Sequence, residues 1–422
     1  MGRYRTGVDP IIQRQSRVAE RWALSDEVVL CRVGEPVPIT GSDQYHPFWA
    51  HPDVRYLAGT DVPGAVLAFD ASDRSWDLFG PRLTPDELVW EQAPPPLGRP
   101  IAELDDWLGR RTGRRVLNVG ADGDPVLTNE LAEIRLHKDQ LELQHLRTAA
   151  TCSLAGFEWV YNNVNPGMTE REVQIGMEAE FFRAGAPRVA YDSIVAGGPN
   201  GAVLHFHPTS RVIEAGDLLL IDAGAQIEGY ASDVSRTMVV GADPTDEQSF
   251  LWHLVRQAQE LAIDRCHPGV EWRDVHLETA RTIGSGLLEL DLLRGEVDEL
   301  VSSGAVALFF PHGLGHLIGL TVHDAGGYRS DRERSSHPQF RYLRTDRPLE
   351  AGMITSVEPG VYFIEALLSD PAVRNAHADS VVWERVDEFE GFGGIRIEDD
   401  IHITDEGPEN LSGGIGKPLS IG

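Results

Sequence analysis

The sequence predicts a mixed α/β protein with two domains, and three observations support this fold class. At 422 residues, the chain is longer than a single hydrophobic core usually accommodates. Its first third alternates short strand-like runs with helix-like segments and turn residues. The remainder follows the order helix, sheet, helix, sheet, which predicts two related α/β halves with sheets that join around one site.

The first third has the pattern of a small α/β domain. Runs at 27–33 (EVVLCRV), 65–69 (AVLAF) and 115–119 (RVLNV) predict strands. Residues 100–111 carry apolar side chains at helical spacing and predict a helix. An amphipathic pattern over 131–160 predicts helices that lead into the second domain. We therefore place the domains at 1–140 and 141–422.

The second domain opens with helices. Thr169 is a predicted N-cap, and Glu172 three residues later completes a capping box. The pattern becomes strand-rich past Gly197, returns to helix over 244–293, and becomes strand-rich again from Ala305.

Composition and charge narrow the class of protein. Acids number 66 against 37 Lys plus Arg, and the formal net charge of -29 argues against a nucleic acid or an anionic membrane as partner. The three cysteines form no CxxC pair, which indicates a reducing compartment. The N-terminus lacks an apolar leader-like run, and no stretch is long and apolar enough to span a bilayer. We expect a cytoplasmic protein.

Four carboxylates and one imidazole form the most informative pattern of the chain. Each is set in an apolar, strand-like run, where a charge is costly to bury unless a cation compensates it. Oxygen ligands with a single nitrogen suit Mn²⁺, Co²⁺ or catalytic Zn²⁺. The pattern predicts a hydrolase with paired metal ions; its members are Asp222, Asp233, His316, Glu358 and Glu398.

Asp222 and Asp233 lie on two runs joined by a turn-like segment at 226–229. Folding this segment about its centre pairs the two aspartates directly across a hairpin, with Cβ atoms about 5 Å apart. A metal ion would turn their repulsion into chelation. The alternative interpretation is two solvated aspartates beside a turn, which the apolar neighbours of both residues disfavour.

The acids near the C-terminus have distinct settings. Arg396 and Glu398 alternate with apolar residues and are predicted to share one strand face. Glu358 ends a strand at a Pro-Gly turn, where it is either an exposed acid or a ligand that also serves as general base.

Three histidines, His312, His316 and His323, fall within twelve residues of a glycine-rich, apolar segment. The glycines oppose a helix and no glutamate separates the histidines, so the HExxH zinc motif is excluded. A core role does not readily explain all three. His205 taken alone is equally compatible with a structural and a functional role.

These residues carry a resemblance to a known family. The segments LLLIDAGAQIEGYASDVSRT, FFPHGLGHLIGLTVHDAGGY, ITSVEPGVYF and FGGIRIEDD resemble the pita-bread metallopeptidases, within their proline-specific branch of prolidases and aminopeptidases P. The similarity covers the second domain and is looser in the first. It implies a creatinase-like α/β N-terminal domain, and a pita-bread catalytic domain with pseudo-two-fold halves.

The resemblance also implies roles for individual residues. It implies two divalent ions, Mn²⁺ before Co²⁺ or Zn²⁺, held by the five residues above, with Asp233 and Glu398 shared between the ions. A metal-bridging hydroxide would be the nucleophile and Glu358 its general base. The other implied roles are catalytic for His312, His323 and Arg396, and substrate-binding for Tyr191, His205, His323 and Arg344.

Within the branch, YLRTDRPLEAGM resembles prolidases, which place an arginine at Arg344 to grip the substrate carboxylate. The first hypothesis is therefore an Xaa-Pro dipeptidase, a homodimer acting on proline-containing peptides. Alternatives are a carboxypeptidase that releases C-terminal proline from longer peptides, and an aminopeptidase P, against which Arg344 counts. The intact ligand set disfavours a metal-free binding protein and a metal-free hydrolase of guanidino compounds on the same fold.

Overall fold

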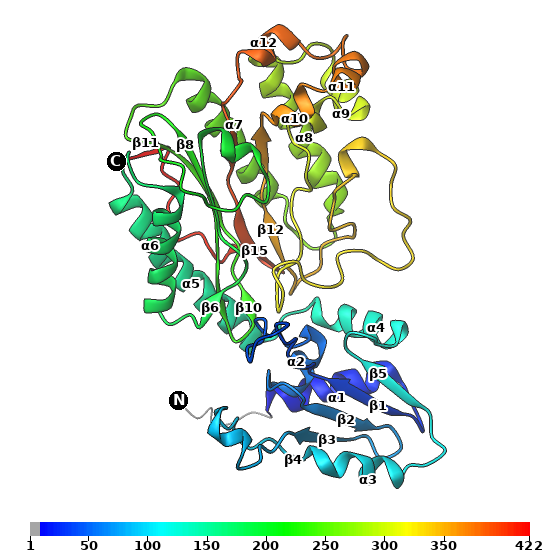
Figure 1. Ribbon diagram of the computed structural model, residues 1–422. Coiled ribbons are helices and arrows are strands. Elements are labelled where there is room, and N and C mark those ends of the chain that lie inside the picture. The colour runs from blue at the N-terminus through cyan, green and yellow to red at the C-terminus, as the bar shows by residue number, and fades with distance from the viewer. Residues whose placement is uncertain (1–8) are drawn as a thin grey trace. The chain divides into compact units, whose positions relative to one another are not determined.

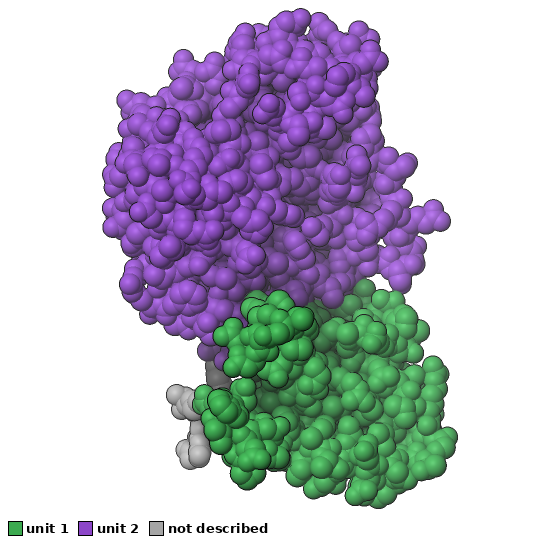
Figure 2. Space-filling model, viewed as in Figure 1, with its two compact units in different colours: residues 1–135 green, residues 136–422 purple. Residues whose placement is uncertain are grey.

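The computed structural model describes residues 9–422, which form two compact units, one ending at Arg135 and the other beginning at Leu136 (Figure 2). The sequence places the boundary after residue 140. Residues 1–8, where part of the search for a leader fell, lie outside the described residues. Across residues 9–422, the structure has no helix with the length and apolar character that a membrane crossing requires.

The N-terminal unit is built on one five-stranded sheet of order β4-β3-β2-β1-β5. The three strand-like runs of the first third all form strands of this sheet, as predicted. β1 pairs antiparallel with β2 and parallel with β5. The strands are β1 (Val28–Arg32), β2 (Val66–Asp70), β3 (Ser75–Gly80), β4 (Arg99–Pro100) and β5 (Val116–Val119).

Four helices complete this unit: α1 (Pro10–Trp22), α2 (Pro52–Ala58), α3 (Leu104–Gly109) and α4 (Pro125–Arg135). At the start of α1 the Asp9 carboxylate accepts the amide of Ile11 at 2.9 Å, and Pro10 occupies the first helical position. The helix predicted over 100–111 is shorter than expected, because its first turn is a 3₁₀ turn at Ile101–Glu103.

The C-terminal unit contains two pairs of long helices, and capping boxes begin three of these four helices. The predicted box of Thr169 and Glu172 is confirmed, and Asp139 and Thr245 form the others. The single helical region predicted over 244–293 is two helices, separated at Pro268-Gly269. The helices are α5 (Gln140–Asn163), α6 (Glu170–Arg183), α7 (Asp246–Asp264), α8 (Trp272–Glu289), α9 (Val297–Ser303), α10 (Glu365–Leu368), α11 (Pro371–Ala376) and α12 (Trp383–Asp387).

The strands of this unit form a β17-β11-β8-β7 sheet, a β12-β15-β16 sheet and two small sheets, β10-β9-β6 and β13-β14 (Figure 1). Their bounds are β6 (Arg188–Val189), β7 (Ile194–Gly197), β8 (Leu218–Asp222), β9 (Ala225–Ile227), β10 (Tyr230–Ala231), β11 (Ser235–Val240), β12 (Ile354–Val357), β13 (Gly360–Tyr362), β14 (Gly394–Arg396), β15 (Asp399–Thr404), β16 (Gly407–Asn410) and β17 (Ser420–Ile421).

Each helix pair supplies its own hydrophobic core. Phe157 of α5 and Phe181 of α6 belong to a core with Ile221 of β8. Val255 of α7 belongs to a second core, shared with Ile401 of β15. Two helix pairs on two sheets correspond to the two α/β halves that the sequence predicts.

The strand-rich pattern predicted from Ala305 is wrong for residues 305–353. In the described chain, these residues form 3₁₀ turns and loops, and the next strand, β12, begins at Ile354. The loop runs beside β12 through backbone hydrogen bonds, including Ser356 N to His316 O at 2.8 Å and Glu358 N to Leu314 O at 2.8 Å. Because the carbonyls of this segment accept from the amides of Ser356 and Glu358, a glycine-rich segment lies against the sheet without regular structure.

The hairpin that carries the two aspartates has a different register from the predicted one. Asp222 pairs with Ser235, two residues beyond Asp233. The reason lies at the tip, where Glu228 (φ 50°) and Gly229 (φ 86°) form a two-residue turn. The turn centre is therefore one residue later than expected, and the aspartates lie diagonally on one face because residues two apart share a face.

Candidate active site

One cavity of about 860 Å³ in the C-terminal unit collects the predicted site residues. The carboxylates reach it from strand ends: Asp222 ends β8, Asp233 precedes β11, and Glu398 precedes β15. All eleven residues named from the sequence line this cavity; they are Tyr191, His205, Asp222, Asp233, His312, His316, His323, Arg344, Glu358, Arg396 and Glu398.

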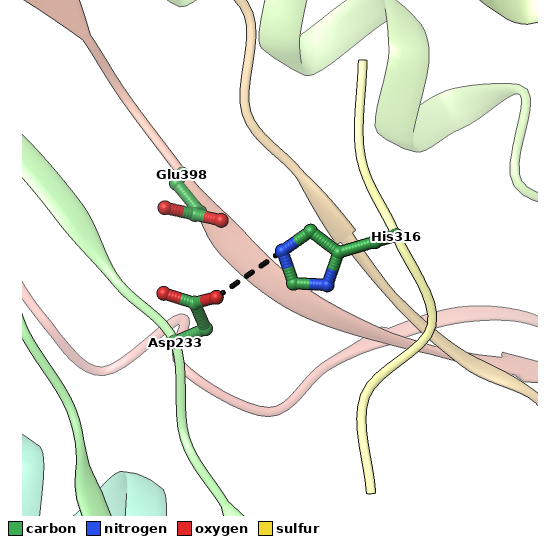
Figure 3. Close-up of side chains that lie close together, drawn as sticks. All are labelled: Asp233, His316 and Glu398. Atoms are coloured by element: carbon green, nitrogen blue, oxygen red, sulfur yellow. Dashed lines mark ion pairs between the residues drawn. The ribbon is translucent and has the colours of Figure 1, made fainter. Parts of the chain in front are cut away.

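Asp233, His316 and Glu398 form the centre of the site. One ligand atom from each lies within 4.8 Å of the others, and all three side chains are buried. Figure 3 shows the imidazole facing both carboxylates, with each residue on a different chain segment. His316 Nε2 lies 3.3 Å from Asp233 Oδ2. Two oxygen donors and one nitrogen donor therefore converge on a single point.

Asp222 and Glu358 flank this centre. The Tyr191 hydroxyl lies 2.6 Å from Asp222 Oδ1 and 2.5 Å from Asp233 Oδ1, so the two aspartates converge on one position. Glu358 Oε1 lies 3.6 Å from His316 Nε2, and its other oxygen lies 3.6 Å from His312 Nδ1. Both residues thus extend the central cluster.

Burial and mutual repulsion make this group of carboxylates unfavourable without a cation. Burial, with repulsion from Asp233 and Asp222, raises the pKa of Glu358 to about 7. Burial likewise raises the pKa of Asp222, and raises that of Glu398 well above its usual range. Asp233 is also buried, yet its hydrogen bond with His316 holds its pKa below the usual value. A divalent cation would replace the protons that such a cluster otherwise needs, and the donor set of oxygens with one nitrogen fits one.

Arg396 is held in place by three polar partners. Its guanidinium donates to Ser235 Oγ at 2.8 Å, to the Tyr362 hydroxyl at 2.8 Å and to Asp222 Oδ2 at 2.6 Å. The Ser235 hydroxyl in turn donates to Glu398 Oε2 at 2.7 Å. Ser235 therefore joins Arg396 and Glu398, although Glu398 itself lies between β14 and β15.

His312 is fixed in a neutral form by the same network. Burial lowers its pKa to about 3, with a further contribution from Arg396. Its Nδ1 lies 2.8 Å from the carbonyl of Gly313, which indicates that Nδ1 carries the proton. The Tyr362 hydroxyl, which accepts from Arg396, is then free to donate to Nε2 at 2.9 Å. Arg396, Tyr362 and His312 therefore form one chain of hydrogen bonds.

Ser235 and Tyr362 also belong to the site, although neither was predicted from the sequence. A signal for Ser235 exists, because it lies two residues after Asp233 and therefore on the same strand face. Tyr362 carries no such signal, because β13 brings it to Arg396 through pairing of Gly360 with that arginine.

Replacing Ser235 with alanine tests the support of Glu398. The change leaves the Arg396 Nε–H and one oxygen of Glu398 without their partner in a buried site. We expect metal affinity to fall about 10- to 100-fold, as when other groups that orient a ligand are removed. Competition with a chelating dye measures this affinity. Ser285→Ala on α8 is the matched control, and equal affinities in the two variants would show that Ser235 has no such role.

Two protein-family models match this chain. The model of metallopeptidase family M24 matches residues 144–405, and the aminopeptidase P N-terminal domain matches residues 11–99. The chain belongs to metallopeptidase family M24, and the two-domain α/β prediction is confirmed. It is a metallopeptidase.

Similar proteins fall into two groups by name. A probable Xaa-Pro aminopeptidase of Botryotinia fuckeliana is 31% identical over 92% of this chain and 90% of its own length. The Xaa-Pro dipeptidase of Homo sapiens is 36% identical over 68% of this chain and 59% of its own length. The aminopeptidase PepP structure of Pseudomonas aeruginosa has a TM-score of 0.81 at 29% identity, covering 97% of this chain and 95% of its own. Aminopeptidase P of E. coli, with the inhibitor Pro-Leu, has a TM-score of 0.81 at 27% identity, covering 98% and 97%.

Proposed function

We propose that this chain is a metal-dependent exopeptidase that hydrolyses the bond between an N-terminal residue and a following proline, as an Xaa-Pro aminopeptidase. The observation that carries the chemistry is the buried cluster of Asp233, His316 and Glu398, which Asp222 and Glu358 flank in the same cavity. The choice among proline-specific activities is supported by similarity over nearly the whole chain to proteins named Xaa-Pro aminopeptidases. The hypothesis drawn from the sequence, a dipeptidase, becomes the second candidate.

The proposed ligands are the five residues of the original pattern, which would hold two divalent ions. The mainly oxygen donor set favours Mn²⁺, and Co²⁺ and Zn²⁺ also fit. Such ions polarise a carbonyl and lower the pKa of a bound water. The ligands are Asp222, Asp233, His316, Glu358 and Glu398.

The proposed work of the protein groups follows from their contacts. Glu358 lies between two imidazoles and lines the cavity, where it would accept the proton of the attacking water. Neutral His312, held by Tyr362, would contact the substrate or pass a proton. His323 lies beside His316, with ring centroids 4.2 Å apart, and would act on the same side. Arg396 would keep Asp222 oriented.

Tyr191 and His205 would line the substrate pocket. The Tyr191 hydroxyl lies between the two aspartates and is therefore near the reacting bond. His205 is exposed in the cavity wall.

The dipeptidase remains a second candidate because of Arg344. Its side chain is exposed in the cavity lining and forms no hydrogen bond or ion pair within residues 9–422. A free guanidinium there suits the terminal carboxylate of an Xaa-Pro dipeptide. The human dipeptidase, 36% identical over 68% of this chain, supports the same candidate. If the amino side of the pocket is open, the same anchor would make a carboxypeptidase acting on longer peptides.

A panel of Ala-Pro, Ala-Pro-Ala, Ala-Pro-NH₂ and Ala-Ala-Pro with Mn²⁺ separates these activities. The aminopeptidase proposal expects cleavage of Ala-Pro-Ala and of the amide, and no cleavage of Ala-Ala-Pro. Release of proline from Ala-Pro alone would instead establish the dipeptidase, and release from Ala-Ala-Pro the carboxypeptidase. No cleavage of any Xaa-Pro bond would end the proposal.

Arg344→Ala sharpens the comparison. If Arg344 binds a terminal carboxylate, the variant loses the equivalent of about 2–5 kcal/mol on Ala-Pro, as when one partner of a buried charge pair is truncated, and discriminates less against the amide. If the aminopeptidase proposal holds, Ala-Pro-NH₂ and Ala-Pro react alike in the wild-type enzyme. The measurement is kcat/KM for both substrates in both proteins.

A further inference from the structure

The outer part of the cavity is basic, although the chain as a whole carries a net charge of -29. The carboxylates of the metal-ligand set are buried or only partly exposed. In the part of the chain that the structure describes, the exposed lining residues include three arginines and three histidines but one acid. They are Asp192, His205, His207, His323, Arg334, Arg341, Tyr342 and Arg344.

Arg334 and Arg341 are held over aromatic rings and not by acids. The guanidinium carbon of Arg334 lies 4.1 Å from the centre of the Tyr328 ring, and that of Arg341 lies 5.2 Å from the centre of the Tyr342 ring. Neither side chain forms an ion pair or hydrogen bond among residues 9–422. A stacked guanidinium is partly immobilised but keeps its donors available for an anion.

Neighbouring arginines of the same loop, unlike Arg334 and Arg341, form ion pairs with acids. Arg329 pairs with Asp331 at 2.7 Å, and Arg332 pairs with Glu271 at 2.8 Å. The acids of this region therefore neutralise the arginines that do not line the cavity. Arg334 and Arg341, which do line it, keep their charge without an acidic partner among residues 9–422.

The part of a substrate that reaches these arginines follows from the proposed activity. An enzyme that removes one N-terminal residue holds that residue and the scissile bond at the buried carboxylates. The rest of the peptide, after the proline, must leave through the exposed part of the cavity. Resting on the proposed function, we propose that Arg334 and Arg341 select peptides with acidic side chains at the two positions after the proline.

The test compares Ala-Pro-Glu-Glu, Ala-Pro-Ala-Ala and Ala-Pro-Lys-Lys by kcat/KM at low ionic strength. A solvent-exposed ion pair is worth up to about fivefold in an equilibrium constant. Two such pairs with glutamate, and the matching repulsion of lysine, give an expected Glu-to-Lys ratio of about tenfold. The effect should lie in KM, and it should shrink in about 0.5 M salt, where the Debye length is only a few ångströms.

The double variant Arg334→Gln, Arg341→Gln is expected to lower the Glu-to-Lys ratio several-fold, with Arg344 left as the remaining exposed arginine of the lining. Arg256→Gln, an exposed arginine on α7 that does not line the cavity, is the matched control and should keep the wild-type ratio. Equal cleavage of the three peptides by the wild type, or an unchanged ratio in the double variant, overturns the inferred preference for acidic peptides and leaves the proposed aminopeptidase activity standing. Cleavage of Ala-Pro without cleavage of any tetrapeptide overturns the proposed aminopeptidase, and this inference with it.

Discussion

Replacing Glu358 with glutamine is expected to lower kcat by roughly 10²- to 10⁴-fold, the usual contribution of a general base. Glu358 has one carboxylate oxygen near His316 and the other near His312, each at 3.6 Å, and it lines the cavity. The amide keeps the size of the side chain but does not accept a proton from an attacking water. Steady-state kinetics on Ala-Pro-Ala at saturating Mn²⁺ measures the effect.

The kinetic pattern distinguishes a base from a positioning residue. Loss of a transition-state role lowers kcat and kcat/KM together, whereas loss of a binding contact raises KM. Glu289→Gln, at the exposed end of α8, is the control for the same change of charge and should behave as wild type. A change confined to KM in Glu358→Gln would remove Glu358 from the role of base.

Asp233→Asn is expected to lose both metal and turnover, with kcat/KM reduced roughly a thousandfold or more, because several kcal/mol of charge stabilisation depend on the bound ions. Asp233 lies at the centre of the site, where its carboxylate contacts Tyr191 and His316. The neutral amide removes a charge that two cations would share. Elemental analysis after dialysis should find fewer metal ions per chain than in the wild-type enzyme.

The control for this change is Asp264→Asn at the exposed end of α7, which should retain both metal and activity. Treatment of the wild-type enzyme with a chelator should abolish activity, and added Mn²⁺ should restore it. Full activity in a sample that elemental analysis shows to be free of metal would contradict the metal-dependent mechanism.

The location of the site could be predicted because each chemically active side chain stands in a distinctive local setting. Asp222 ends a buried strand, Glu358 directly follows one, and His316 lies in a glycine-rich apolar segment that opposes a helix. Burying an acid among apolar residues is costly, so the pattern alone indicates a compensating ligand. The capping box at Thr169 was predictable for a similar reason, because helix N-termini are satisfied by residues close in sequence.

The errors arose where non-local pairing decides the structure. The two-residue turn at Glu228-Gly229 pairs Asp222 with Ser235 and not with Asp233. The apolar residues that flank the turn do not indicate this register. Residues 305–353 were expected to be strand-rich, yet they form 3₁₀ turns and loops, and the carbonyls of Leu314 and His316 accept from the amides of Glu358 and Ser356. Hydrophobicity shows that such a segment is buried, but it does not show which partner satisfies its backbone.

The sequence by itself determined the mixed α/β fold class with two domains, and it singled out the four carboxylates and His316, because apolar periodicity and charge in apolar runs are local properties of the chain. Only the tertiary structure decided how the site is supported. Ser235 joins Arg396 to Glu398, and Tyr362 joins Arg396 to His312, through pairing of strands distant in sequence. The tertiary structure also places Arg334 and Arg341 in the cavity lining without an acidic partner, whereas the neighbouring Arg329 and Arg332 form ion pairs. Hydrogen bonds and ion pairs depend on distances of a few ångströms, and folding alone sets those distances.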